Sequence, residues 1–300
     1  MIDPERAQTR LENVRSVQPI LGALRSISLG SWQAALRQSE RVRQHREQLS
    51  ALPSLLVARL PAKPSRVQRG GHDQAERARA AILVVGSERG LCGRFNTAVV
   101  ERAESHLSEL EASDVSVELM GLGNRVRRVI ERQGRALVWS GNLSTTTLPS
   151  HSLAFELTRY WLARYEAREL DSVDLVYNAY GGMGNYAPAV VRLIPPIPPQ
   201  AEQQPEQETP IIETDPLSLY THVIEQLTTV HLYEILLDSA AAEHAARYEL
   251  MEAATRNTEE LITDLTLAIQ TARQQAITQE MQELAVGAGM IGTRQMKGAR

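Results

Sequence analysis

The chain has 300 residues, a formal net charge of −4 and a composition of 43% hydrophobic, 23% charged and only 4% aromatic residues. The small negative charge, with no basic stripe interleaved with aromatics, argues against a nucleic-acid partner. One cysteine, Cys92, excludes an intrachain disulfide and fits a reducing compartment. We expect no signal peptide and no direct membrane insertion, because apolar runs stay far below the about 20 residues of a membrane span.

Residues 1–55 are predicted to form one long helix. Asp3 suits the N-cap and Pro4 the first helical position. We expect Pro19 to bend the helix and Pro53 to mark its end, and the Pro-, Gly- and Arg-rich residues 61–79 to form a loop. Apolar or small residues recur at steps of three and four, as in a coiled coil: Val14, Val17, Leu21, Leu24, Ser28, Ser31 and Ala35.

Residues 80–195 alternate between strand and helix patterns, which predicts a small α/β domain with a mostly parallel sheet. The apolar run 80–85, closed by Gly86, is typical of a buried strand. Further strands are expected at 115–120, 136–139, 173–180 and 190–194, and helices at 95–110, 123–132 and 150–168.

Residues 196–216, rich in Pro, Gln and Glu, are predicted to be an exposed linker. A C-terminal helix is expected over 217–290, because residues 217–286 contain neither Gly nor Pro; such a helix would be roughly 100 Å long. It needs a partner helix or an enclosing cavity. We therefore predict an antiparallel coiled coil with the N-terminal helix. The seam is expected at Val230, Tyr233, Leu237, Ala240, His244, Arg247, Met251, Ala254, Thr258, Leu261, Leu265, Ala268 and Ala272.

The stretch from Gly86 to Asn96 lies where a strand hands over to a helix, which would suit a phosphate cradle. It lacks both the Gly-Lys-Ser/Thr ending and the Gly-x-Gly-x-x-Gly pattern, so a tight structural turn is favoured. Adjacent positive charge could lower the pKa of Cys92, but no catalytic Cys/His grouping accompanies it and a packed thiol is favoured. His244 is interpreted as a hydrogen-bonded interface histidine. No catalytic residue, metal site or cofactor is predicted.

Several motifs resemble those of gamma subunits of F-type rotary ATP synthases. Glu243-His244-Ala245-Ala246-Arg247, with Met251 four residues on, is similar to that family's Ser-Glu-His-Ala-Ala-Arg…Met element. The turn Arg89-Gly90-Leu91-Cys92-Gly93 is similar to the family's Arg-Gly-Leu-Cys-Gly-Gly. The C-terminal pattern continues the resemblance in register with Ala272-Arg273-Gln274, Ile277-Thr278-Gln279-Glu280, Glu283 and Gly287-Ala288.

The resemblance implies a non-catalytic central rotor shaft without a cofactor. Its coiled coil would stand inside a hexameric ring of alternating alpha and beta subunits, and its α/β domain near the epsilon subunit and the membrane ring of c subunits. The complex would be peripheral on the cytoplasmic face of a bacterial-type inner membrane. By family position, Arg25, Arg273 and Gln274 would contact the beta ring. Structural motif positions would be Arg89, Gly90, Leu91, Cys92, Gly93, His244, Arg247, Thr278 and Glu280.

The first helix departs from the family pattern, because Pro19 and Gly22 replace two of its lysines. That departure leaves open a gamma-derived scaffold that no longer rotates. A different class also stays open: an α/β small-molecule enzyme with a coiled-coil dimerisation arm, which would bind a nucleotide at Gly86–Asn96.

Overall fold

The computed structural model describes residues 4–57, 77–196 and 215–287. They form two compact units, one of residues 4–25 with 251–287 and one of the described residues between 26 and 250. Two long helices, α1 (Pro4–Ser50) and α6 (Pro216–Gly287), contribute to both units, and the short helix α2 (Leu52–Val57) follows α1. The predicted cap at Asp3 and most of the predicted loop and linker lie outside the described residues.

The long helices confirm the expectation that the chain begins and ends in extended helical segments. Helix α6 runs without interruption for 72 residues. Helix α1 continues through Pro19 for 47 residues and ends at Ser50, slightly before the predicted end. Pro53 then lies in the first turn of α2. N–H groups in the first turn of a helix make no hydrogen bond within the helix, so the missing N–H of proline costs nothing there.

A five-stranded sheet forms the centre of the second unit, in the order β3-β2-β1-β4-β5. The first four strands in this order pair in parallel, and β5 pairs antiparallel with β4. This confirms the mostly parallel sheet. The third strand was misplaced at 136–139, because Leu137 packs over the sheet as part of the core and pairing begins only at Trp139. The strands are β1 (Arg79–Val85), β2 (Ser116–Leu122), β3 (Trp139–Gly141), β4 (Ser172–Tyr180) and β5 (Tyr186–Ile194).

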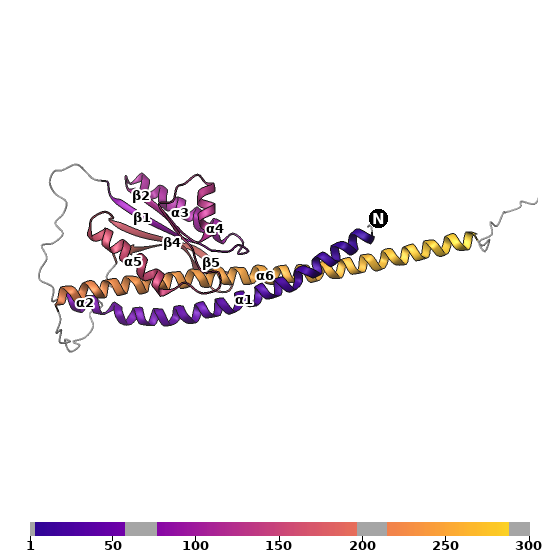
Figure 1. Ribbon diagram of the computed structural model, residues 1–300, viewed down its shortest axis with the longest axis horizontal. Helices are drawn as coiled ribbons and strands as arrows, with labels where there is room; N and C mark the ends of the chain where they lie inside the picture. The colour runs from indigo at the N-terminus through magenta and orange to yellow at the C-terminus, as the bar shows by residue number, and fades with distance from the viewer. Residues whose placement is uncertain (1–3, 58–76, 197–214, 288–300) are drawn as a thin grey trace, which may run out of the picture. The chain divides into compact units, whose positions relative to one another are not determined.

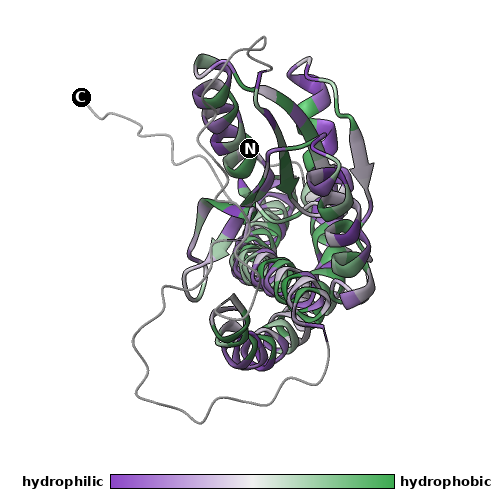
Figure 2. Cartoon of the chain, turned by 90° about the vertical axis from the view of Figure 1, so that its left-hand side faces the viewer, coloured by the Kyte–Doolittle hydropathy of each residue, from purple (hydrophilic) through white to green (hydrophobic). Residues whose placement is uncertain are grey.

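Helices cover both faces of the sheet (Figure 1). On one face, Ile82 and Val84 of β1 pack with α3 (Phe95–Ala112) and α4 (Asn124–Arg132). On the other face, alternate β1 residues pack with α5 (His151–Glu166) and with α6. Because both faces are covered, β1 is hydrophobic and buried from Ala80 to Val85, as expected of a buried parallel strand. Hydrophobic residues likewise gather where the helices and the sheet of the chain meet (Figure 2).

Helix α6 is also part of the core of the α/β domain. Leu232, Ile235 and Leu236 are at most 4% exposed and belong to the same hydrophobic cluster as the sheet and α5. The C-terminal helix therefore completes the second helical layer of the domain before it reaches the coil.

Within the second unit, α1 and α6 pack through small residues. Trp32 and Ala35 of α1 contact a patch of three buried alanines on α6, Ala240, Ala241 and Ala245. Nearer the end of α1, Arg46 forms a 2.5 Å ion pair with Glu234. Residue numbers rise along α1 as they fall along α6, so the two helices run antiparallel.

The same pairing holds within the first unit. Ala7 and Leu11 form a small cluster with Ile269 of α6, and Arg25 forms a 2.9 Å ion pair with Glu252. The antiparallel coiled coil predicted from the two terminal helices is thus confirmed.

The predicted seam is correct in part. Its positions from Met251 to Ala272 on α6 are all buried or half-buried, but it omits other residues that face α1. On α6, the α1-facing clusters contain Ala241, Ala245, Ile262 and Ile269, which the prediction omitted, and share with it only Ala240 and Leu265. On α1, Val17 is 45% exposed although it was placed in the seam. The reason is that α6 is buried on two faces between 230 and 250, so a single three-and-four stripe mixes the α1-facing residues with the domain-facing ones.

We expect Ala241→Leu to destabilise the chain by about 1–3 kcal/mol, because Ala241 is fully buried against α1 and extra methylenes would force the helices apart. Urea unfolding followed by circular dichroism measures the change. Ala253→Leu makes the same substitution at an exposed position of α6 and should shift the midpoint little. Equal stability of the two variants would contradict close packing at Ala241.

Candidate functional site

The turn from Gly86 to Asn96 is held together by its own side chains. The Ser87 N–H donates to Asn96 Oδ1 at 2.9 Å, and the Asn96 amide donates back to Ser87 Oγ at 2.8 Å. Ser87 Oγ donates in turn to the Arg89 carbonyl at 2.7 Å. The turn requires glycine at position 86, because the Cβ of any other residue there would lie 2.5 Å from the Cβ of Val126. These internal bonds occupy groups that a phosphate cradle would need free, which favours the structural turn.

Cys92 lies inside this turn and is 3% exposed. Its sulfur lies 3.6 Å from Ser87 Oγ and accepts from the Asn96 amide at 3.5 Å. Burial raises the pKa of the Cys92 thiol above its ordinary value. The thiol is therefore protonated at neutral pH and serves as a packed side chain, in line with the interpretation from sequence.

Glu88 fixes the outer side of the turn to the α/β domain. Its Oε2 accepts from the Asn124 N–H at 3.1 Å, at the start of α4, and from the Leu143 N–H at 2.9 Å. A carboxylate at a helix N-terminus is stabilised by the exposed N–H groups there. One side chain thus ties the turn both to α4 and to the segment that follows β3.

Arg247 fixes the inner side of the turn to α6. Its Nε donates to the Gly90 carbonyl and its Nη2 to the Arg89 carbonyl, both at 3.3 Å. Nη2 also donates to the Glu243 carboxylate, and Nη1 lies 3.1 Å from His244 Nδ1. The two family-like motifs of the sequence, far apart in the chain, therefore meet at one place.

The charged groups at this junction are shielded from water. Arg247 is 8% exposed. Burial raises the pKa of Glu243, and the opposing charge of Arg247 counteracts that shift. Burial lowers the pKa of His244 to about 4, and Arg247 adds to the effect. His244 is therefore neutral at neutral pH, which leaves Nδ1 able to accept a hydrogen bond from Arg247.

The remaining predicted site residues lie in the first unit. Arg25 is already paired with Glu252 across the coil. Arg273 Nη2 donates to Gln8 Oε1 of α1 at 3.4 Å. Gln274 and Glu280 are exposed, and the Thr278 hydroxyl donates to the Gln274 carbonyl of its own helix at 2.8 Å. These side chains thus do not join the junction around Arg247.

Sequence reasoning overlooked an apolar stripe at the end of α6. Every residue from 273 to 284 is exposed, and among them Ile277, Met281 and Leu284 are 57%, 66% and 72% exposed. Their spacing of four and three places them on one face of the helix. The spacing of these apolar residues is visible in the sequence, but it looks the same as the spacing of the coiled-coil seam that precedes it.

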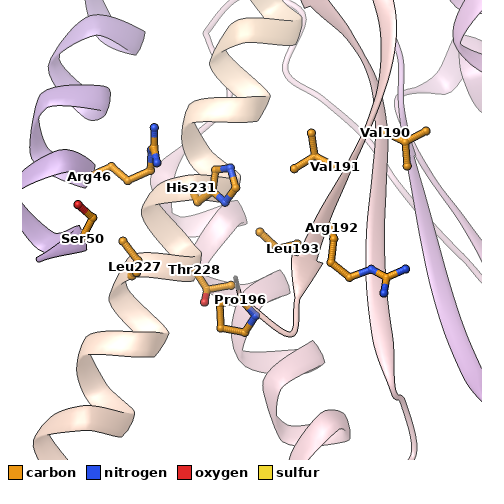
Figure 3. A pocket seen from close by; sticks show the side chains of 10 residues that line it. All are labelled: Arg46, Ser50, Val190, Val191, Arg192, Leu193, Pro196, Leu227, Thr228 and His231. Atoms are coloured by element: carbon orange, nitrogen blue, oxygen red, sulfur yellow. The ribbon is translucent and has the colours of Figure 1, made fainter. Parts of the chain in front are cut away.

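A cavity of about 410 Å³ was also not foreseen. It lies between α1, β5 and α6 in the second unit, with Arg46, Leu193, Leu227 and His231 among the residues that line it (Figure 3). Burial lowers the pKa of His231 to about 4, with a smaller contribution from Arg46. Its lining therefore combines apolar side chains with two arginines, Arg46 and Arg192, and one neutral imidazole.

Two long antiparallel helices carrying a small α/β domain define a helical stalk protein. None of the helices in the described ranges is long and apolar enough to cross a membrane.

A family model described as ATP synthase matches residues 5–290 of this chain. The ATP synthase gamma chain of Rubrobacter xylanophilus is 30% identical, with 93% of this chain and 95% of that protein covered. The chain belongs to the family of ATP synthase gamma chains.

Other relatives agree with this assignment. The ATP synthase gamma chain of Pelotomaculum thermopropionicum is 29% identical over 94% of this chain and 96% of that protein. A chain from the Euglena gracilis mitochondrial ATP synthase matches the fold with a TM-score of 0.59 at 16% identity, over 99% of both chains. A chain from the central stalk and c-ring structure of the Tetrahymena thermophila enzyme matches with a TM-score of 0.55 at 19% identity, over 78% of this chain and 99% of that one.

The lowered pKa of His231 and of His244 predicts a loss of stability in acid. From pH 6.5 down to about 4 the unfolded chain binds protons that these buried imidazoles do not, so the free energy of unfolding falls as the pH falls. Each histidine should contribute on the order of 2 kcal/mol to the loss at pH 5.

Urea unfolding at pH 7 and pH 5 tests this. His244→Gln should reduce the difference between the two pH values, whereas His45→Gln, at an exposed position of α1, should leave it unchanged. If His244→Gln lost as much stability between pH 7 and pH 5 as the unaltered chain, the lowered pKa assigned to His244 would be wrong.

Proposed function

We propose that this chain is the central rotor shaft of an F-type ATP synthase. In that role it couples ion-driven rotation of the membrane ring to ATP synthesis or hydrolysis in the alpha/beta ring. The observation that carries the proposal is the exposed end of α6 with its stripe of Ile277, Met281 and Leu284. A helix without a partner is marginal in water, and a continuous apolar stripe implies a covering surface. A ring of subunits enclosing this end would provide that surface.

The shaft acts without chemistry of its own. A single asymmetric rod presents different side chains to each of the surrounding catalytic subunits at a given angle. The free energy of each catalytic conformation therefore depends on the angle, and nucleotide affinity and rotation become linked reciprocally. Catalysis is assigned to the beta subunits and not to this chain.

Arg273 and Gln274 are the residues proposed to make angle-dependent contacts with the beta ring. They lie at the start of the exposed stretch of α6, and among the described residues Arg273 is held by a 3.4 Å bond to Gln8. A charge-assisted hydrogen bond to a carboxylate of the ring would be shorter and stronger than this amide contact. Arg25 is the weaker candidate, because contact with the ring would compete with its 2.9 Å pair with Glu252.

The α/β domain is proposed to lie near the epsilon subunit and the c ring, with the whole complex peripheral on the cytoplasmic face of the membrane. The alternative of a nucleotide-binding enzyme lacks a supporting observation. Its candidate site, the turn at Gly86–Asn96, is filled by Ser87, Asn96 and Cys92.

The proposal predicts co-assembly. Expressed together with the alpha and beta subunits encoded in the same genome, the full-length chain should co-purify with both and support ATP hydrolysis. Steady-state ATPase assays on gel-filtered complexes measure this. The chain purified alone should not hydrolyse ATP, and sustained turnover by the chain alone would overturn the proposal.

A triple substitution of Ile277, Met281 and Leu284 by Ser should weaken assembly and coupled ATP synthesis, because the covering ring would lose its apolar contacts. The matched control replaces Gln275, Gln279 and Gln282, which are also exposed on α6, by Ser. ATP synthesis driven by an imposed ion gradient in reconstituted vesicles is the measurement. Equal rates of ATP synthesis by both triple variants would show that coupling does not depend on the apolar stripe.

A further inference from the structure

Torque applied to the α/β domain can pass into α6 at the contacts between the two, and into α1 where Tyr180 of β4 meets Trp32. We propose that Arg247 is the positioning residue that clamps α6 to the domain against rotation about the helix axis, an inference that rests on the proposed rotor function. The clamp consists of Arg247 and the carbonyl groups of Arg89 and Gly90, to which its guanidinium donates.

The guanidinium of Arg247 is almost saturated with partners. Nε binds the Gly90 carbonyl, and Nη2 binds both the Arg89 carbonyl and Glu243. Nη1 reaches His244 Nδ1 at 3.1 Å. Four of its five N–H groups are therefore used, and the planar fork fixes the direction of each. The partners lie on two elements, because Glu243 and His244 belong to α6 while the carbonyl groups belong to the turn.

Besides the bonds of Arg247, α6 meets the domain through a hydrogen bond from the Tyr180 N–H to Asp238 at 3.2 Å, an ion pair of Glu225 with Arg159 at 3.7 Å, and apolar clusters. Leu232 and Ile235 pack in the sheet cluster, and Ala242 packs with Cys92 and Phe95. Hydrophobic contacts oppose separation but are non-directional, so they resist a small rotation weakly. Hydrogen bonds weaken steeply when their angle changes. The paired bonds from Arg247 therefore oppose twisting in a way that the apolar contacts do not.

Both sides of the clamp are rigid. On the domain side, Ser87 binds the Arg89 carbonyl and Glu88 ties the turn to Asn124 and Leu143. On the helix side, the next residue, Tyr248, has its ring centroid 6.0 Å from that of Trp32 on α1. The domain, α6 and α1 thus meet within one helical turn, so a rotation held at Arg247 passes to both helices of the coil.

Glu243 has a different role from the carbonyl groups. It neutralises the buried charge of Arg247, and its loss would leave that charge uncompensated. It belongs to α6 itself, however, so its bond to Arg247 does not cross to the domain. Removing Glu243 should therefore lower stability without releasing the clamp, whereas shortening Arg247 should release it.

The test uses the complete ATP synthase reconstituted in vesicles with Arg247→Lys, Glu243→Gln or Arg43→Lys, the last being the same change at an exposed position of α1. Lysine keeps the charge but lacks the planar fork that fixes the directions of the bonds to the two carbonyl groups. Arg247→Lys should lower the amount of ion pumping per ATP hydrolysed, while Glu243→Gln and Arg43→Lys keep the unaltered ratio. An unaltered ratio for Arg247→Lys, or an equal fall for Glu243→Gln, would overturn the clamp.

The same experiment separates this inference from the proposed function. If the unaltered chain supported neither assembly nor pumping, the proposed rotor function itself would be refuted.

If Arg247→Lys did not assemble, hydrogen exchange measured on the full-length chain would test the clamp instead. The amides of Ser87 and Phe95, which are hydrogen-bonded within the turn, should then exchange on the order of tenfold faster than in the unaltered chain, as expected from losing a charged hydrogen bond that holds the turn. Unchanged exchange there would overturn the clamp.

Discussion

A helix as long as α6 is stable only where its apolar residues are covered, because helix propensity alone gives marginal stability in water. Between residues 230 and 250 this helix is covered twice, by the sheet and α5 on one side and by α1 on the other. Farther along, α1 alone covers it at Ile269, and residues 273–284 are exposed. This stepwise loss of cover along one helix determines both where the chain is self-supporting and where a partner is required.

The contacts that provide this cover differ in kind. The pairing of α1 with α6 packs one large side chain, Trp32, against a patch of alanines on α6. The pairing of α6 with the turn at Gly86–Asn96 uses a buried arginine with directed hydrogen bonds. The motif Glu243-His244-Ala245-Ala246-Arg247 serves both, since Ala245 faces α1 while Glu243 and Arg247 meet at the turn. One short segment therefore joins three elements.

The departures of this chain from its relatives do not disrupt the elements that contain them. Pro19 lies inside α1, and the helix continues through it. A side chain at Gly22 would meet no atom within 4 Å, so the glycine there is not required by close packing. At 30% identity to the Rubrobacter xylanophilus gamma chain, this chain thus has intact long helices and an intact sheet.

The sequence by itself determined the long helices, the mostly parallel sheet and the turn at Gly86, since Gly, Pro and apolar periodicity are local signals. It also revealed, by resemblance, the motifs around Arg89 and Arg247. It did not determine which residues of α6 between 230 and 250 face α1, the start of β3 or the antiparallel pairing of β5. Only the tertiary structure decided that Arg247 turns to the domain and Ala241 to α1. A helix that is buried on two faces carries two overlapping apolar stripes. Periodicity cannot tell which stripe packs on the α/β domain and which packs on α1.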